Sequence, residues 1–591
     1  CPRAQSSYSR LRPMDVLRTL FSLLTRRERR NLSILFVAVL AMASLQVASV
    51  ASIMPFLSVA SDPSIIQENE YLRWAYRTGG FDDDRSFLIA LGIAALLVLV
   101  LSNAFIVLTR WAVERYSWGR NHSLSRRLLR SYLHRPYEYF LTRNSAELGK
   151  NILEEVKEVT DQMLKPALRG AAKGIVALFI VGFLVYFDPV VALMVSVVLG
   201  AAYGGIYVVV REQLDARGEA RVEANTKRYQ FVGEAFGGIK EVKIQGKEDA
   251  FLDLYDDPSR RYAQSQALYR VIKKVPRYVI EAVAFGGIIL IAIYLIAIRE
   301  SIQQVVPVLG LYAFAGYRLL PALQQAFHGL ASARFNVAAL NKLHRDLRGR
   351  IGSRMRSQAE GRNPSPDDPL ALRHCLALRG VTYTYPDAQR PAIKNLSFTL
   401  PARTTTGFVG KTGSGKTTVV DLILGLLRPE DGAITIDGTP LRDDTRRRWQ
   451  ETLGYVPQHI YLSDASVAQN IAFGVSAENI DMDAVRDAAR RAHILGGQRQ
   501  RIGIARALYH EPSVLVFDEA TSALDPSTEA QVMEAIYKLD GEQTILLVSH
   551  RLSTVRRADN ILMLGDGQKV GEGTYDELIE EHSQFRSMAL S

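Results

Sequence analysis

Apolar and polar residues are distributed along the first half of the chain in long blocks. Six apolar stretches precede residue 331, at approximately 31–60, 87–109, 168–187, 190–210, 278–298 and 302–330. The second and fourth each run for about 20 residues without a charge, which at 1.5 Å per residue crosses a hydrocarbon core of about 30 Å. A buried soluble helix can imitate one such stretch, but hardly six. The pattern therefore predicts an α-helical bundle of six membrane spans over residues 31–335.

The charges between these stretches predict the orientation of the bundle. The segment 61–86 carries acidic residues, whereas the segments after the second and fourth stretches are long and rich in Lys and Arg. Because cytoplasmic loops carry the excess of Lys and Arg, both termini are expected in the cytoplasm. Residues 1–30 then form an N-terminal cytoplasmic segment, and 61–86 lies outside.

The two long cytoplasmic segments, about 110–167 and 211–277, are charged and helix-prone, with breaks at 134–137, at Gly233 and at 237–238. We expect membrane helices that continue into the cytoplasm, turn through short helices that contact the C-terminal domain, and return. An ordinary loop is the alternative, although loops of this length without structure are uncommon.

The second half of the chain has a different pattern. Residues 336–372 become polar and gain Pro and Gly, which is typical of a linker. From 373 to 591, short runs rich in β-formers alternate with helical patterns, which predicts an α/β domain.

A phosphate-binding loop is predicted at residues 410–417. The sequence fits G-x-x-x-x-G-K-[ST], follows an apolar run, and precedes a helical pattern, which is the context that this motif requires. Backbone N–H groups of such a loop surround phosphates at a helix N-terminus. Lys416 would reach the β- and γ-phosphates, and the Thr417 hydroxyl would ligate Mg²⁺.

Two carboxylates follow an apolar strand at 513–519. Asp518 would lie near Mg²⁺, and Glu519 would accept a proton from the attacking water. A lone Asp-Glu pair is usually a solvated turn, but here it ends a hydrophobic strand in a phosphate-binding domain.

At this point the sequence resembles the ATP-binding cassette exporters, because further motifs occur in that family's order over about 170 residues. The resemblance implies an adenine-stacking role for Tyr385, a Mg²⁺-contacting role for Gln458, a γ-phosphate contact for His550, and an interface loop containing Asp525. It also implies ATP and Mg²⁺ as cofactors, and a homodimer, since two cassettes bind each ATP between one phosphate loop and the opposite signature.

Three groups of site residues follow. The catalytic residues are Glu519, His550 and Gln458, and the Mg²⁺ ligands are Thr417, Gln458 and Asp518. The expected ATP-binding residues are Tyr385, Gly410, Lys411, Thr412, Gly413, Ser414, Gly415, Lys416, Thr417, Thr418, Gly496, Gly497, Gln498 and Asp525.

The signature departs from the family pattern. Ile494-Leu495 runs directly into Gly496, so the usual serine is absent, and the stretch before it is short by roughly 20 residues or more. Either a segment is missing from this sequence or the deletion is real. A real deletion would put ATP hydrolysis in doubt but not nucleotide binding.

The formal net charge of +11 does not indicate nucleic acid, because the excess Lys and Arg lie where membrane topology places them. The two cysteines, Cys1 and Cys375, are far apart and predict no disulfide framework, which suits a reducing compartment. We expect a multi-pass protein of the bacterial inner membrane with a cytoplasmic cassette.

The membrane half resembles flippases of lipid-linked oligosaccharides, on the motifs at 52–63, 275–278 and 317–321 and the helix-prone segment 64–82. The resemblance implies a polyprenyl-diphosphate-linked oligosaccharide or a related glycolipid as cargo. Arg277 and Arg318 would both lie at inner-leaflet depth and could bind the pyrophosphate, since Arg binds phosphate with two N–H groups. Alternatively, Glu281 neutralises Arg277, and Arg318 extends to the surface.

The expected function is ATP-driven export or flipping. One alternative is an exporter of another lipid, a drug or a peptide. The other is an ATP-binding membrane protein with impaired hydrolysis, which the absent signature serine motivates.

Overall fold

The computed structural model describes residues 13–187, 189–298, 302–348, 369–492, 499–520, 526–537 and 541–590. The chain divides into two compact units. The membrane unit comprises residues 1–134 and 143–353, and the cassette unit comprises residues 135–142 and 354–591. The short segment 135–142, which contains the expected break after residue 134, therefore groups with the cassette.

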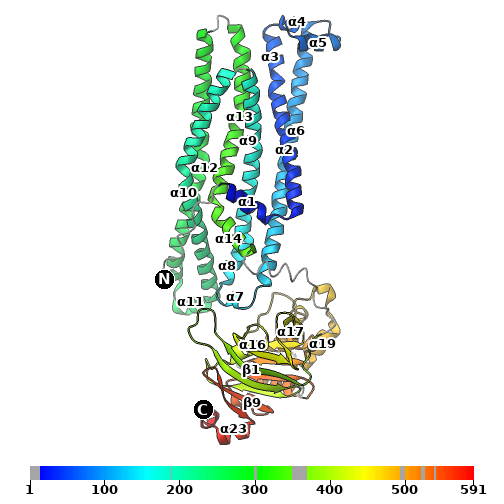
Figure 1. The fold of residues 1–591 in the computed structure, drawn as a ribbon, viewed down its shortest axis with the longest axis vertical. Coiled ribbons are helices and arrows are strands. Elements are labelled where there is room, and N and C mark those ends of the chain that lie inside the picture. The colour runs from blue at the N-terminus through cyan, green and yellow to red at the C-terminus, as the bar shows by residue number, and fades with distance from the viewer. Residues whose placement is uncertain are drawn as a thin grey trace. The chain divides into compact units, whose positions relative to one another are not determined.

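The membrane unit is built from long helices that run along one another (Figure 1). Its helices are α1 (Pro13–Leu23), α2 (Arg26–Ala51), α3 (Ile53–Ser61), α4 (Ile65–Glu68), α5 (Glu70–Thr78), α6 (Asp84–Leu133), α8 (Ser145–Lys150), α9 (Lys165–Phe187), α10 (Pro189–Gly237), α11 (Ile239–Gln245), α12 (Glu248–Ile298), α13 (Ile302–Phe335) and α14 (Val337–Arg348). Two π-helical turns, η1 (Asn151–Glu155) and η2 (Glu158–Leu164), lie between α8 and α9.

Among the described residues, four helical segments are long and apolar enough to cross a membrane: Arg26–Ser61, Asp84–Leu133, Ser145–Tyr186 and Ala192–Gly237. They cover nearly all of the first four expected spans, and the stretches 278–298 and 302–330 lie on α12 and α13. The expected turn at 188 and the junction at 299–301 lie outside the described residues.

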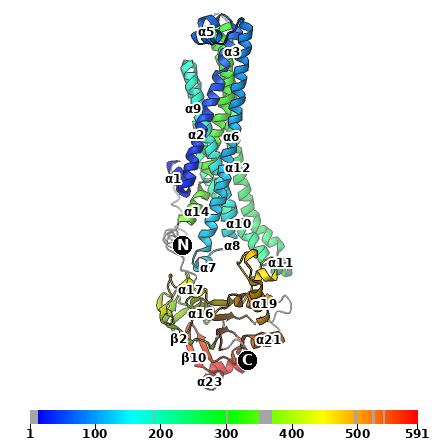
Figure 2. The same cartoon turned by 90° about the vertical axis from the view of Figure 1, so that its right-hand side faces the viewer.

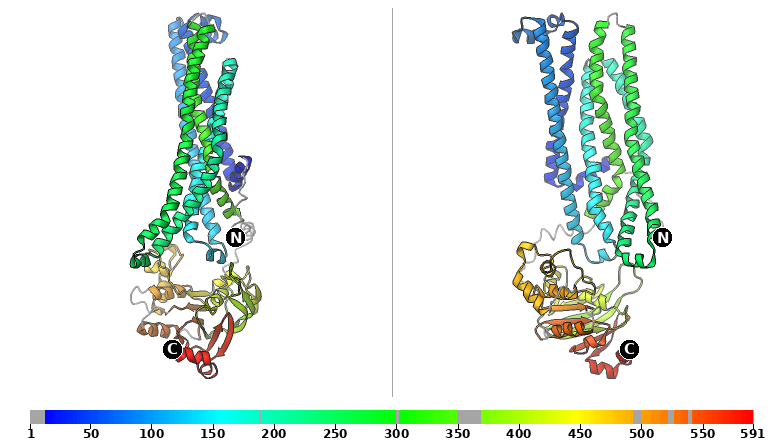
Figure 3. Two further views of the ribbon diagram at one scale, coloured as in Figure 1. Left: turned by 90° about the vertical axis from the view of Figure 1, so that its left-hand side faces the viewer. Right: turned by 180° about the vertical axis from the view of Figure 1, so that it is seen from behind.

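The helices continue well beyond the apolar stretches, as expected for the two long cytoplasmic segments. Figure 3 shows α11 joining the ends of α10 and α12. The break expected at Gly233 is wrong, because α10 continues through it to Gly237. A single glycine costs a helix only about 1 kcal/mol, which the packing of a long helix offsets.

The beginning of the expected linker is also helical. Helix α14 occupies 337–348 and belongs to the membrane unit. Ala339, Leu340 and Leu343 are fully buried there, because their spacing places them on one face of the helix.

A buried ion cluster lies in a part of the membrane unit that the sequence predicts to be cytoplasmic. Glu155 lies 3.2 Å from Lys150 Nζ and 3.3 Å from Arg221 Nη2, and all three side chains are inaccessible to solvent. Burial is the main cause that lowers the pKa of Lys150, to about 8. The cluster connects α8 and η1 to α10.

At the opposite end of the bundle, the expected external segment forms a small folded cap (Figure 2). Ile66 of α4 packs with Val59 of α3 and Phe87 of α6, and the half-buried Leu72 and Tyr76 of α5 lie against them.

The cassette unit contains two sheets. The four-stranded sheet has the order β2-β1-β4-β5, and the six-stranded sheet has the order β10-β9-β3-β8-β7-β6. The strands are β1 (Cys375–Tyr383), β2 (Ile393–Pro401), β3 (Thr405–Val409), β4 (Asp431–Ile436), β5 (Thr439–Pro440), β6 (Leu453–Val456), β7 (Val514–Asp518), β8 (Thr544–Val548), β9 (Asn560–Gly565) and β10 (Gln568–Gly573). Strands β9, β3, β8, β7 and β6 are parallel neighbours, and β10 is antiparallel to β9.

The helices of the cassette unit are short. They are α7 (Glu138–Leu141), α16 (Lys416–Ile423), α17 (Arg446–Gln450), α18 (Val467–Ile471), α19 (Met482–Arg491), α20 (Arg499–Leu508), α21 (Pro526–Tyr537), α22 (Leu552–Val555), α23 (Tyr575–Glu581) and α24 (Ser583–Leu590), with one 3₁₀ turn, η3 (Ala477–Asn479).

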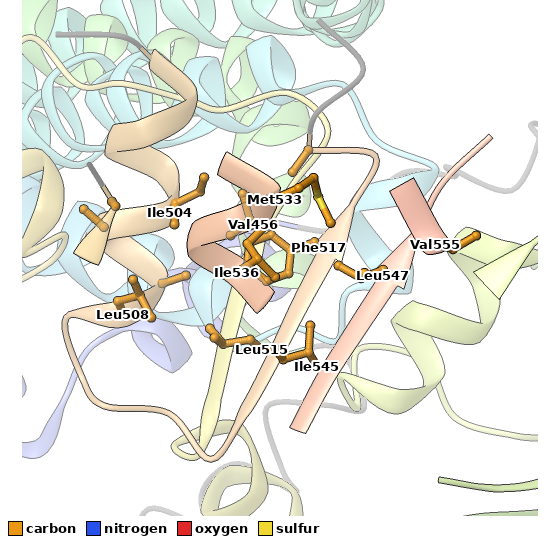
Figure 4. Close-up of a cluster of buried hydrophobic side chains, with 14 of the residues drawn as sticks. Val456, Ile504, Leu508, Leu515, Phe517, Met533, Ile536, Ile545, Leu547 and Val555 are labelled. Carbon is orange, nitrogen blue, oxygen red and sulfur yellow. The ribbon is translucent and has the colours of Figure 1, made fainter. Parts of the chain in front are cut away.

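The central strands are buried on both faces, so they read as continuous apolar runs rather than alternating ones. On one face, Phe517 and Leu547 pack with Ile536 of α21 and Leu508 of α20 (Figure 4). On the other face, a second cluster fills the space between the two sheets and α16, with Trp449 fully buried and its indole N–H donating to Ile423 O at 2.7 Å. These two cores hold the carboxyl ends of the parallel strands in place.

Candidate nucleotide site

The expected phosphate loop lies between β3 and α16. Gly410 and Gly415 have φ angles of 151° and 99°. A Cβ at Gly410 would lie 2.3 Å from Leu564 O, and one at Gly415 would lie 2.7 Å from Ile393 Cδ1, so only glycine fits at either position. The loop therefore turns tightly and exposes its N–H groups at the N-terminus of α16.

Lys416 points back over this loop. Its Nζ donates to Gly410 O at 2.8 Å and to Lys411 O at 3.1 Å, and the residue is 5% exposed. Burial lowers the pKa of Lys416, and the carboxylates of Glu519 and Asp518 act in the opposite direction. The ammonium group and the two carboxylates thus share one site, as the sequence predicts.

The polar residues after β6, β7 and β8 meet beside the loop, because the carboxyl ends of parallel strands lie at one edge of a sheet. Gln458 Nε2 donates to Glu519 Oε2 at 2.8 Å, and His550 Nε2 contacts Glu519 Oε1. Glu519 has a φ of 50°, a conformation that a non-glycine residue adopts rarely and that is concentrated at functional sites. Three expected catalytic residues are therefore in contact.

Asp518 is buried at the end of β7, and Tyr455 lies beside it on β6. The Tyr455 hydroxyl donates to Asp518 Oδ2 at 3.4 Å. Burial raises the pKa of Asp518, and the adjacent Glu519 adds to the rise. Tyr455 is not among the residues expected from the sequence, although it lies on β6 only three residues before Gln458.

Tyr385 stands at the other side of the loop. Its hydroxyl lies 3.0 Å from Thr418 Oγ1, and its ring packs edge-on against Tyr383 with centroids 5.1 Å apart. The half-buried ring therefore borders the N-terminus of α16. Gly496, Gly497, Gln498 and Asp525 lie outside the described residues.

Two family models match the chain over most of its length. The model of the ABC transporter transmembrane region matches residues 31–315, and the ABC transporter model matches residues 393–522. The chain belongs to the ABC transporters. It is accordingly an ABC-type ATPase coupled to transport, with the fold of an ABC exporter.

Relatives of this ABC transporter align along most of the chain. An ATP-dependent lipid A-core flippase of Salmonella paratyphi A is 26% identical and aligns with 91% of this chain and 94% of its own. A protein of the same name from Burkholderia orbicola is 27% identical, with 76% and 77% covered. The solved structure of a bacterial Atm1-family ABC exporter with ATP bound matches 95% of the chain with a TM-score of 0.75 at 20% identity, which shows the shared fold.

The residues expected to hold Mg²⁺ fit that ion. Thr417, Gln458 and Asp518 supply oxygen atoms, which Mg²⁺ prefers. Among the described residues no group of three or more His, Cys, Asp or Glu forms a metal site of its own. Such an arrangement suits an ion that takes its remaining ligands from phosphates and water.

The two arginines expected to bind cargo have different hydrogen-bond partners. Arg277 Nε donates to Glu281 Oε1 at 2.7 Å on the same helix, which is the neutralised arrangement that the sequence left open. Arg318 lies on α13, and its Nη1 and Nη2 are each 3.4 Å from Asn103 Oδ1 of α6. The hydrogen-bond partner of Arg318 is thus a neutral amide.

Proposed function

We propose that this ABC transporter uses ATP to move a lipid across the bacterial inner membrane, and that its favoured cargo is a polyprenyl-diphosphate-linked oligosaccharide or a related glycolipid. The observation that carries this proposal is Arg318, a guanidinium inside an apolar helix whose hydrogen-bond partner is a neutral amide. Intramembrane charges are costly and usually face a cavity or a partner, so this one needs an anion.

The proposed binding residues are Arg277 and Arg318. Arg277 lines a cavity of about 310 Å³ between α12 and α13, together with Lys273, Lys274 and His328. The cavity is basic, and it lies on the same two helices as Arg318. A headgroup that carries phosphate suits such a lining.

We further propose that two copies of the chain form the working transporter and that Glu519 is the general base in each cassette. Closure of the two cassettes around two ATP molecules would bring the cytoplasmic helix ends together and change the side of the membrane that the cavity faces. Hydrolysis of ATP would return the cavity to its original orientation. Mg²⁺ would be held by Thr417, Gln458 and Asp518, and Gln458 also donates a hydrogen bond to Glu519.

A second cargo is favoured by the relatives. The names of two of them assign them lipid A-core, so a lipid of that kind is the alternative within the same mechanism.

The proposal is tested by following lipid movement in proteoliposomes whose cassettes face outward. A fluorescent glycolipid enters the outer leaflet, and ATP is added outside. We expect the fraction of headgroups protected from an added glycosidase to rise with ATP in the parent protein and to stay at background in Glu519→Gln. Parallel assays with polyprenyl-diphosphate oligosaccharide and with lipid A-core show which of the two lipids is transported. ATP consumption with no protection of either lipid would contradict lipid flipping.

A further inference from the structure

Helix α20 lies against the chain on both sides of Gln458. Before Gln458, a Cβ at Gly454 of β6 would lie 2.6 Å from Ala507 O of α20, so the strand and helix backbones are in contact there. After Gln458, a Cβ at Gly503 of α20 would lie 2.3 Å from Ile460 Cδ1. The position of the loop that carries Gln458 therefore depends on α20.

This loop has few backbone hydrogen bonds of its own. Within the described chain, residues 458–462 form no backbone–backbone hydrogen bond. A side chain of α20 supports the loop instead, because Arg506 donates from Nη1 to Tyr461 O at 2.9 Å and from Nε to Asn470 O at 2.8 Å. The Arg506 guanidinium also lies over the Phe473 ring, 4.6 Å from its centroid. A planar guanidinium with several donors suits two carbonyl oxygens that come from different segments.

Asn470 extends this support along the loop. It is 4% exposed, and its Oδ1 accepts from Arg506 Nη2 at 3.3 Å and from the Ser463 N–H at 2.9 Å. Its Nδ2 donates to the carbonyl oxygens of Ser463, Ala465 and Ser466 at 3.1, 3.1 and 3.2 Å. Arg506 and Asn470 thus hold the second half of the loop on α20.

Gln458 depends on this support because its own side chain is exposed. Its Nε2 donates to Glu519 Oε2 at 2.8 Å, and the carbonyl that Arg506 holds is only three residues further along the chain. A shift of the loop backbone would therefore lengthen the contact with Glu519. Hydrogen bonds weaken once the two heavy atoms are more than about 3.2 Å apart, so a small shift is sufficient.

Arg490 provides a contrast on the neighbouring helix α19. Its side chain is 77% exposed, and its Nη1 lies 3.4 Å from Asp487 Oδ1, three residues earlier on the same helix. Arg490 therefore connects no separate segments, whereas Arg506 connects α20 with Tyr461 and Asn470.

We propose that Arg506 is a positioning residue for the nucleotide reaction, which holds the loop where Gln458 reaches Glu519. This inference rests on the proposed role of Gln458 as a Mg²⁺ ligand and is independent of the cargo. In sequence, α20 directly follows the signature glycines at 496–497. A movement of α20 would consequently be transmitted to Gln458 through Arg506.

The test measures nucleotide affinity of the full chain in lipid nanodiscs, with fluorescent trinitrophenyl-ATP as the probe. Each protein is titrated once with Mg²⁺ and once with a chelator that removes it. The variants are Arg506→Gln, Gln458→Ala and the double variant, with Arg490→Gln as the matched control. Arg506→Lys is a milder second variant, because its single ammonium group replaces the fork of donors. Thermal unfolding midpoints show whether each variant is folded.

We expect Arg506→Gln to weaken the affinity measured with Mg²⁺ about tenfold and to leave the Mg²⁺-free affinity unchanged. Gln458→Ala should show the same selective loss. The double variant should lose no more than Gln458→Ala alone, because Arg506 acts through Gln458. Arg506→Lys should show an intermediate loss, and Arg490→Gln should bind as the parent does.

Several results would overturn the proposal. An equal loss with and without Mg²⁺ in Arg506→Gln would show a general structural role, and additive losses in the double variant would show that Arg506 acts independently of Gln458. Parental behaviour of Gln458→Ala would leave Arg506 with nothing to position. If Arg506→Gln does not fold, parental Mg²⁺-supported affinity in Arg506→Lys overturns the proposal.

These binding measurements need neither ATP turnover nor cargo, so they are judged separately from the flipping assay. The expected binding pattern in a protein that flips no lipid supports the role of Arg506 and rejects lipid transport. Lipid flipping with additive losses in the double variant rejects the role of Arg506 and leaves lipid transport standing.

Discussion

Asp421 shows how burial changes one residue next to the nucleotide site. It lies on α16 behind the phosphate loop and is 8% exposed. Burial, with a smaller contribution from Asp518, raises the pKa of Asp421 from 3.8 to about 7. The folded protein therefore keeps a proton between about pH 4 and pH 7 that the unfolded chain has released. The contribution of Asp421 to the free energy of unfolding therefore falls as the pH rises through that window.

Replacing Asp421 by Asn should remove this dependence. We expect Asp421→Asn to unfold like the parent near pH 4 and to be more stable by about 1 to 3 kcal/mol at pH 8, since the amide has no proton to lose. Calorimetric unfolding of the solubilised chain across this pH range provides the measurement. The exposed Asp444→Asn is the control and should follow the parent. If Asp421→Asn shows the same dependence of stability on pH as the parent protein, the raised pKa of Asp421 is contradicted.

Residues with a local pattern could be found from the sequence, and residues placed by packing could not. Lys416 and Glu519 belong to a loop and a strand end whose neighbours in sequence predict their roles. Lys173 lies in an apolar stretch that also contains Arg169, and its hydrogen-bond partner, Gln46, comes from another helix. The lateral order of helices in a bundle is not encoded in the periodicity of any one of them.

At the scale of elements, α9 and α13 pack closely against each other. The two helices approach through Gly170 and Gly329, where a side chain would meet backbone atoms. Membrane helices associate through such small residues because they lack a hydrophobic driving force between them.

A methyl group at this contact should separate the helices. We expect Gly329→Ala to destabilise the membrane unit by about 1 to 3 kcal/mol, because its Cβ would lie 2.6 Å from Pro166 O. Gly174→Ala is the control, since its Cβ would meet Ala326 Cβ at an ordinary 3.9 Å. Thermal unfolding midpoints and the yield of monodisperse protein compare the two. Equal behaviour of both variants means that the close approach is not needed.

The ends of helices agree with the sequence-based prediction where a strong helix-breaking pattern occurs. The break after residue 133 coincides with the His-Arg-Pro turn, and the one after Gly237 with a Gly-Gly pair. Gly233 does not end a helix, because the surrounding residues favour the helix by more than one glycine disfavours it. The sequence predicts a linker where α14 forms, because polar residues surround the narrow buried face of Ala339, Leu340 and Leu343.

At the scale of the whole molecule, one unit holds the nucleotide machinery and the other holds the intramembrane charges. The cassette brings Lys416, Asp518, Glu519, Gln458 and His550 to one sheet edge. In the membrane unit, the hydrogen-bond partners of Lys173 and Arg318 are the neutral amides of Gln46 and Asn103. Transport requires that hydrolysis in the first unit change what the second can bind.

The most direct test is the steady-state ATPase activity of the full chain in lipid nanodiscs, compared with Glu519→Gln. Glu519 contacts both Gln458 and His550, and we propose that it accepts a proton from water. We expect turnover in the parent that rises with a phosphorylated lipid and falls by at least about 100-fold in Glu519→Gln, with ATP binding retained. ATP binding without turnover in the parent would contradict the account and would make the short signature region the deciding feature of this transporter.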